Sequence, residues 1–146
     1  MGENVVGSVS IGGDITSSNS GIIVDGSITA ESGEGYGVYV GGNITSYNSG
    51  IIVDGSITAD SAEGYGVYVG SNITSAGTAI SVAGDINGYM AGIQAGSVTA
   101  TSDTSGIGIN ITNGISAKNG IDISGDITSN DVGVYVGGAI TSDTAI

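Results

Sequence analysis

The chain has 146 residues, 29 of them glycine, and it contains no cysteine, histidine or proline. Fourteen acidic residues against one lysine give a net charge of −13, which excludes recognition of nucleic acid or anionic lipid through a basic patch. The missing cysteines exclude disulfides and thiol chemistry, and no apolar run approaches the ~20 residues that a membrane span requires. The length predicts a single domain, residues 1–146.

An internal repeat dominates the chain from residue 13 onward. Residues 13–25 read G-D-I-T-S-S-N-S-G-I-I-V-D, and residues 42–54, which begin 29 positions later, read G-N-I-T-S-Y-N-S-G-I-I-V-D. Before the repeat, an entering strand is expected from the spacing of Val5, Val6, Val9 and Ile11. Units of the type G-x-I-T-[SA] begin at Gly13, Gly26, Gly42, Gly55, Ser71, Gly84, Gly96, Asn113, Gly125 and Gly138. Repeats of this length predict a stack of similar structural units.

Within a unit, apolar residues alternate with polar ones. Ile51, Val53, Ile57 and Ala59 share one parity with Gly55, a pattern typical of half-buried strands that meet at a glycine bend. One buried column is expected from Ile15, Ile28, Ile44, Ile57, Ile73, Ile86 and Ile127. A second is expected from Val24, Val40, Val53, Val69, Val82 and Val136. A single unit cannot bury its apolar edge, but stacked units can.

The repeat therefore predicts an all-β fold, a parallel β-solenoid. The unit starts are 12–17 residues apart, which favours about ten short rungs, because Ser71 and Gly84 both open short units. The alternative is about five coils of ~29 residues. Neither terminus offers a polar cap, so we expect uncapped ends that stack head to tail on further copies.

Two later stretches resemble a known group of proteins. Residues 71–86 read S-N-I-T-S-A-G-T-A-I-S-V-A-G-D-I, and residues 120–129 read G-I-D-I-S-G-D-I-T-S. Both are similar to repeats of bacterial autotransporter passengers and haemagglutinin-like adhesins. The resemblance implies an extracellular or cell-surface β-helical stalk or adhesive fibre. It carries over no catalytic residue.

The residues for enzyme chemistry are scarce. Without histidine or cysteine there is no Ser-His-Asp or Cys-His arrangement, and Lys118 is the one lysine. Carboxylate pairs remain, but a β-helix enzyme acting on acidic sugars would need arginine or lysine for its substrate. We expect a protein that is not an enzyme and that needs no cofactor.

Acidic residues recur at equivalent places and make calcium the one metal to consider. The candidate ligands are Asp25, Asp54, Glu31, Glu34, Asp60 and Glu63. Stacked carboxylates beside carbonyls suit a hard cation. However, the glycine- and aspartate-rich nonapeptide of calcium-binding β-rolls is not matched, and a solvated acidic edge explains the same residues.

Outward residues supply two candidate binding surfaces. A threonine column is expected from Thr16, Thr29, Thr45, Thr58, Thr74, Thr99, Thr128 and Thr141. Regular threonine arrays on flat solenoids bind ice, although threonine is also favoured on any exposed sheet. Exposed aromatic surface is expected from Tyr39, Tyr68 and Tyr135, beside Ile23 and Ile52. Asn43, Asn72 and Asn110 lie in N-x-T sequons, which are glycosylation acceptors or an asparagine ladder.

These observations lead to one functional hypothesis and an alternative. The hypothesis is a non-enzymatic structural or adhesive segment, a stalk or filament-forming part of a surface protein. The alternative is an ice-binding or glycan-binding solenoid that uses its outward threonine and tyrosine faces. Its partners would be further copies of itself, or a glycan or other surface ligand, without nucleic acid and without membrane insertion.

Overall fold

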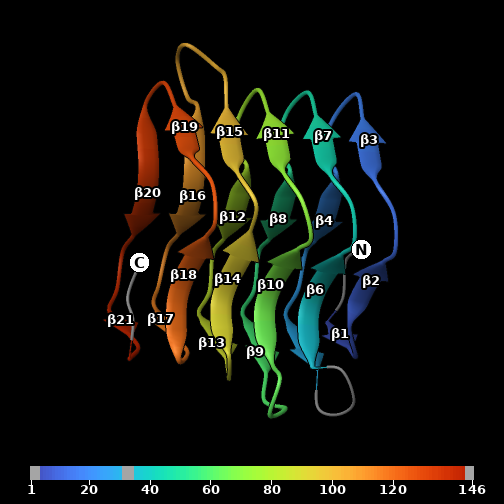
Figure 1. The fold of residues 1–146 in the computed structure, drawn as a ribbon, viewed down its shortest axis with the longest axis vertical. Helices are drawn as coiled ribbons and strands as arrows, with labels where there is room; N and C mark the ends of the chain where they lie inside the picture. Colours follow the sequence, from blue (N-terminus) through green and yellow to red (C-terminus); the bar gives the residue numbers. More distant parts are fainter. Residues whose placement is uncertain (1–3, 31–34, 144–146) are drawn as a thin grey trace.

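The computed structural model describes residues 4–30 and 35–143, which form short β-strands arranged in four parallel sheets (Figure 1). The described residues contain no helix. Each strand pairs with its equivalents in the preceding and following coils, so the chain is a parallel β-solenoid, as the repeat predicted.

The four sheets, named A to D, follow one another around each coil. Sheet A consists of β1 (Val5–Val6), β5 (Ile28–Ala30), β9 (Ile57–Ala59), β13 (Ile86–Gly88), β17 (Ile115–Ser116) and β21 (Ile140–Thr141). Sheet B consists of β2 (Val9–Ile11), β6 (Tyr36–Val40), β10 (Tyr65–Val69), β14 (Ala91–Ala95) and β18 (Asn119–Ile123). Sheet C consists of β3 (Ile15–Ser17), β7 (Ile44–Ser46), β11 (Ile73–Ser75), β15 (Val98–Ala100) and β19 (Ile127–Ser129). Sheet D consists of β4 (Ile22–Val24), β8 (Ile51–Val53), β12 (Ile80–Val82), β16 (Ile107–Ile111) and β20 (Val132–Val136).

The register fixes the length of a coil at about 29 residues. Ile15 pairs with Ile44, and Ile44 pairs with Ile73. The expectation of ten short rungs is therefore wrong, and the alternative of long coils is right. Each unit of 12–17 residues is half a coil: alternate units supply the strands of sheets C and D and the strands of sheets A and B. Sheets B and C form one layer and sheets D and A the other; the two layers face each other across the core (Figure 1), and each strand pairs only with its own copies.

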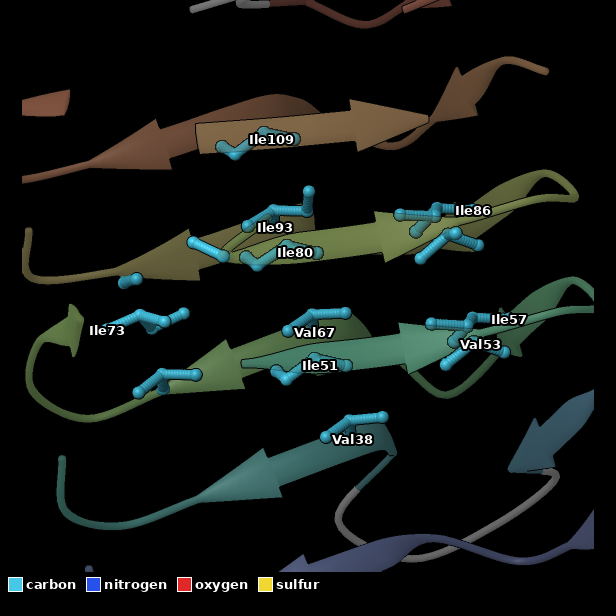
Figure 2. Close-up of a cluster of buried hydrophobic side chains, with 14 of the residues drawn as sticks. Val38, Ile51, Val53, Ile57, Val67, Ile73, Ile80, Ile86, Ile93 and Ile109 are labelled. Atoms are coloured by element: carbon cyan, nitrogen blue, oxygen red, sulfur yellow. The ribbon is translucent and has the colours of Figure 1, made fainter. Parts of the chain in front are cut away.

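The core lies between these two layers and consists almost wholly of isoleucine, valine and alanine. Figure 2 shows how Ile51, Ile80 and Ile109 follow one another from coil to coil, and all three are fully buried. Burial of an isoleucine or valine contributes roughly 1.5–3 kcal/mol of hydrophobic free energy. Because every coil repeats the same inward residues, the stack supplies a continuous core that no single coil could form.

The two expected columns are each divided between two sheets. Ile28, Ile57 and Ile86 stack in sheet A, whereas the remaining isoleucines of that set stack in sheet C: Ile15, Ile44, Ile73 and Ile127. The valines divide similarly, with Val40 and Val69 in sheet B and the others in sheet D: Val24, Val53, Val82 and Val136. The inward parity was right; the division follows from the longer coil.

Glycines bring neighbouring coils close together where each layer bends. Gly55 lies at the bend between β8 and β9, as predicted, and an added Cβ would come 2.4 Å from Ser27 Oγ. Gly37 serves another purpose in β6, because its Cβ would come 2.3 Å from Ile57 Cγ2. Gly37 and Val38 are consecutive and both buried, so the strict alternation of β6 is interrupted there.

Side-chain oxygens tie the coils together at both bends. Between sheets B and C, Asp14 Oδ1 accepts from the Asn43 amide at 2.6 Å, and Asn43 Oδ1 accepts from the Asn72 amide at 3.1 Å. Asn72 Oδ1 in turn accepts from the Ser97 amide at 2.9 Å. Between sheets D and A, the same role falls to the side chains of Asn4, Ser27, Ser56 and Asp85. In every case the earlier coil accepts and the later coil donates.

The repeat loosens after residue 70, mainly in its end turns. Residues 60–64 connect β9 to β10, but only residues 89–90 connect β13 to β14, and residues 117–118 connect β17 to β18. The register from β10 to β14 falls accordingly to 26 residues, with Tyr65 beside Ala91. This shortening explains why the unit that opens at Gly84 is short directly after the short unit at Ser71, which the sequence had suggested was evidence for a short rung.

Candidate binding surfaces

The outer face of sheet C carries an unbroken threonine ladder. Its members occupy the same register position in five successive strands: Thr16, Thr45, Thr74, Thr99 and Thr128. Adjacent strands lie about 4.8 Å apart. The other three expected threonines, Thr29, Thr58 and Thr141, belong to sheet A, where Asn87 and Ser116 occupy the positions between Thr58 and Thr141. The single column of eight is therefore wrong, because the threonines of alternate units lie in sheets C and A, on opposite layers.

The residues on the two sides of the threonine ladder differ in chemistry and in height above the sheet. On one side lie the bend residues Asp14, Asn43 and Asn72, whose side-chain oxygens already accept amide hydrogen bonds. On the other side Tyr47, directly after β7, is 76% exposed. The ladder is thus a single row of hydroxyls and methyls, bordered by a charged or amide row and a protruding ring.

A cluster of four tyrosines covers part of sheet B. The rings of Tyr39 and Tyr68 stack at a centroid distance of 5.4 Å, and those of Tyr36 and Tyr65 stack at 5.3 Å. The two stacks also touch each other, with Tyr36 and Tyr39 at 5.0 Å. Such pairs contribute about 0.5–1.5 kcal/mol beyond simple burial. All four rings are only half-exposed, so cross-coil packing accounts for much of their surface.

Sequence reasoning missed Tyr36 and Tyr65 as members of this cluster. Period-2 alternation assigns Tyr36 and Tyr39, three residues apart, to opposite faces. The two consecutive buried residues between them restore Tyr36 to the outer face. The available signal was the repeated G-Y-G-V-Y-V, in which glycine precedes the inward valine.

Tyr135 lies apart from the cluster, on the outer face of sheet D. It is 53% exposed and pairs in register with Asn110. Further along the same row are Ile23, which is 43% exposed, and Ile52, which is half-buried. The expected exposed aromatic set of Tyr39, Tyr68 and Tyr135 is thus divided between two sheets on opposite layers.

The calcium candidates are dispersed over the surface. Asp25 and Asp54 are exposed at equivalent positions after β4 and β8, and Asp60 and Glu63 lie in the turn between β9 and β10. Glu31 and Glu34 lie outside the described residues. Within residues 4–30 and 35–143, no three acidic, histidine or cysteine side chains gather as a metal-binding group.

The sequon asparagines occupy two kinds of place. Asn43 and Asn72 belong to the ladder at the bend between sheets B and C, and Asn43 Nδ2 also donates to Asp14 Oδ1 at 3.3 Å. Asn110 is half-buried on the outer face of β16. The ladder interpretation of Asn43 and Asn72 is therefore confirmed.

The outer face of sheet A is hollowed near its later strands. Its floor is the row Asn87, Ser116 and Thr141, on β13, β17 and β21. One open hollow, with a volume of about 410 Å³, lies over this row beside Asp85 and Asn113. Two adjoining hollows extend it to Tyr89, Lys118, Asp143 and Asp60. We call this surface the sheet A trough; no motif in the sequence had pointed to it.

No known protein family, curated protein or solved structure matches the chain. In the described part of the chain there is also no helix of the length and apolar character needed to cross a membrane.

Proposed function

We propose that this chain is a non-enzymatic structural segment of a secreted or cell-surface protein, a rod or stalk built from repeated coils. The observation that supports the proposal most strongly is the continuity of the core. The same Ile and Val positions are filled from coil to coil, and backbone and side-chain hydrogen bonds join each coil to the next. A stack in which each coil contacts only its neighbours is elongated, as a rod or stalk must be.

The surface composition is consistent with that role. The inward positions carry the apolar residues, and the outer rows are filled by threonine, serine, asparagine and acidic residues that keep an acidic rod soluble. The resemblance of residues 71–86 and 120–129 to adhesin repeats supports an extracellular location. The outward tyrosines and the threonine ladder offer adhesive surfaces along the rod.

The same geometry favours assembly of the rods end to end. Among the described residues, no strand pairs with β3 on the side away from β7, or with β19 on the side away from β15. Exposed parallel edges recruit further strands. The later end of one copy would receive the earlier end of the next, and this heterologous contact repeats without closing. We therefore propose a head-to-tail filament as the assembled form.

One position tests this stacking without disturbing a single chain. Gly21, Gly50, Ala79, Gly108 and Gly133 occupy one column, which holds nothing larger than alanine. A Cβ on Gly108 would lie 2.5 Å from the Gly133 carbonyl oxygen of the following coil. A Cβ on Gly133 meets only ordinary contacts, at 3.8 Å or more. Because the Cβ of residue 133 has room within one copy, we expect Gly133→Ile to be accommodated there and to block the arrival of another copy.

The experiment compares the unmodified chain, Gly133→Ile and the control Tyr135→Ile by electron microscopy and fibre diffraction. We expect fibres from the unmodified chain and from the control, with a reflection near 4.8 Å along the fibre axis. Gly133→Ile should stay monomeric with an unchanged melting temperature. Head-to-tail stacking would be contradicted if the unmodified chain remained monomeric at all concentrations. It would also be contradicted if Gly133→Ile formed fibres.

The threonine ladder supports a second candidate function, ice binding. Five threonines at a regular spacing of about 4.8 Å form one row of the kind that can order water. An ice-recrystallisation assay tests it with Thr74→Lys and, as a control on another face, Thr58→Lys. Inhibition that only Thr74→Lys abolishes would support ice binding; no inhibition by the unmodified chain would end it.

A further inference from the structure

The sheet A trough exists because the repeat changes there. Between β9 and β10, the turn that joins sheet A to sheet B is five residues long and comprises residues 60–64. In the next two coils it contracts to residues 89–90 and 117–118. The longer turn, which carries Asp60, borders the trough on one side, and the shorter turns form a lower rim. A hydrogen bond joins the two kinds of turn, because the Met90 amide donates to the Gly64 carbonyl at 2.7 Å.

Both rims of the trough are held in place by hydrogen bonds between coils. On the side of the shortened turns, the Lys118 amide donates to the Tyr89 carbonyl at 3.0 Å, and the Asp143 amide donates to the Lys118 carbonyl at 3.0 Å. On the opposite side, the Gly114 amide donates to Asp85 Oδ1 at 2.9 Å, and the Gly138 amide donates to the Asn113 carbonyl at 2.7 Å. A site fixed in this way loses little entropy when a ligand binds.

The chemistry of the lining is mixed and mostly neutral. The floor supplies an amide from Asn87 and hydroxyls from Ser116 and Thr141, which both donate and accept hydrogen bonds. Tyr89, at 58% exposure, offers an aromatic ring at the rim. Lys118 and Asp143 place opposite charges beside it. The polar groups of the floor could hydrogen-bond hydroxyl groups on the edge of a ligand, and the exposed ring could contact C–H groups on the ligand's face.

We propose that the sheet A trough binds an extended neutral oligosaccharide, whose chain runs along the solenoid axis across β13, β17 and β21. A sugar ring would lie on Tyr89, and its neighbours would place hydroxyls against Asn87, Ser116 and Thr141. The spacing of about 4.8 Å between coils is close to the repeat of an extended hexose chain, so a periodic ligand meets a periodic floor. The proposal does not depend on filament formation, because one chain contains the whole trough.

Other ligand classes fit less well. Phosphate or sulfate groups would face Asp60, Asp85 and Asp143 with only Lys118 to attract them. A non-polar peptide would leave the amide and hydroxyls of the floor without partners, which is costly. A cationic peptide is the real competitor, because the whole chain is acidic; it would bind by charge and weaken in salt.

The test starts from a panel of neutral hexose and N-acetylhexosamine oligomers of four to six units, titrated into ¹⁵N-labelled protein at low and high salt. We expect amide shifts at residues 85–89, 113–118 and 138–143, with an affinity that 0.5 M NaCl leaves within twofold. Tyr89→Ala and Asn87→Ala should each lower the affinity at least tenfold. Tyr135→Ala and Asn110→Ala, which alter the same residue types on sheet D, should not.

Circular dichroism must show that every variant melts as the unmodified chain does, and Tyr89→Phe provides a second check because it keeps the ring. Retained binding by Tyr89→Phe together with loss by Tyr89→Ala would support stacking. The proposal fails if no oligomer shifts the trough amides at millimolar concentration, or if the sheet D variants lose binding equally. It also fails if oligolysine binds the trough and high salt abolishes that binding while the sugars have no effect.

Discussion

At the scale of single residues, the fold depends on which side of a strand each side chain occupies. Ile57 is fully buried between the layers, while its neighbour Thr58 faces outward from sheet A. The same alternation is repeated in the paired strands β5 and β13. A change of one residue in parity would therefore exchange core and surface over a whole coil.

Replacing Ile57 by Asp should prevent its coil from packing. A buried carboxylate without a partner is prohibitively costly, and we expect a loss of more than about 4 kcal/mol in the free energy of unfolding. Thr58→Ser serves as the control, with a loss under about 1 kcal/mol. Thermal melting by circular dichroism measures both. Equal losses would show that the inward and outward positions are assigned wrongly.

At the scale of the strand, β6 and β10 show how one glycine changes what a repeat presents to solvent. Two consecutive buried residues let Tyr36 and Tyr39 lie on the same outer face, and β10 repeats the arrangement in register. The four rings then support one another across the coil boundary. In a strand with strict alternation, one tyrosine of each strand would point inward, into a core that is too narrow for its ring.

The stacking of Tyr39 on Tyr68 should be measurable as a coupling energy. We expect the double-mutant cycle of Tyr39→Ala and Tyr68→Ala to give about 0.5–1.5 kcal/mol, the worth of an aromatic pair. Urea unfolding of the four proteins provides the free energies. The matched cycle of Tyr39→Ala with Tyr135→Ala, on another sheet, should be additive within about 0.5 kcal/mol. Additivity in both cycles would mean that the stack contributes nothing.

At the scale of the whole molecule, repetition determined most of the fold. The solenoid, the parallel pairing and the inward residues followed from the spacing of I-T and I-x-V segments. The coil length did not, because sheets B and C resemble sheets D and A so closely that half a coil looks like a whole one. The same likeness merged Thr29 and Thr58 with the threonine ladder.

The sheet A trough was beyond prediction for a different reason. It arises where the repeat is least regular, from turns that contract at residues 89–90 and 117–118, and from rims that meet only when three coils are stacked. Asn87, Tyr89 and Lys118 carry no motif in sequence. Their common position depends on the register between coils, which the sequence alone left open between two lengths.

The stacking of coils in a single line also determines how the chain would respond to a pulling force. Each coil is bonded only to its two neighbours, so a force that pulls the two ends of the chain apart loads the last coil first and peels it from the stack. Every coil that detaches releases about 29 residues, which extend to roughly 100 Å of chain in place of a rise of about 4.8 Å. Under tension the stack would therefore lengthen in steps of about one coil, by about twentyfold in all, before its backbone is strained.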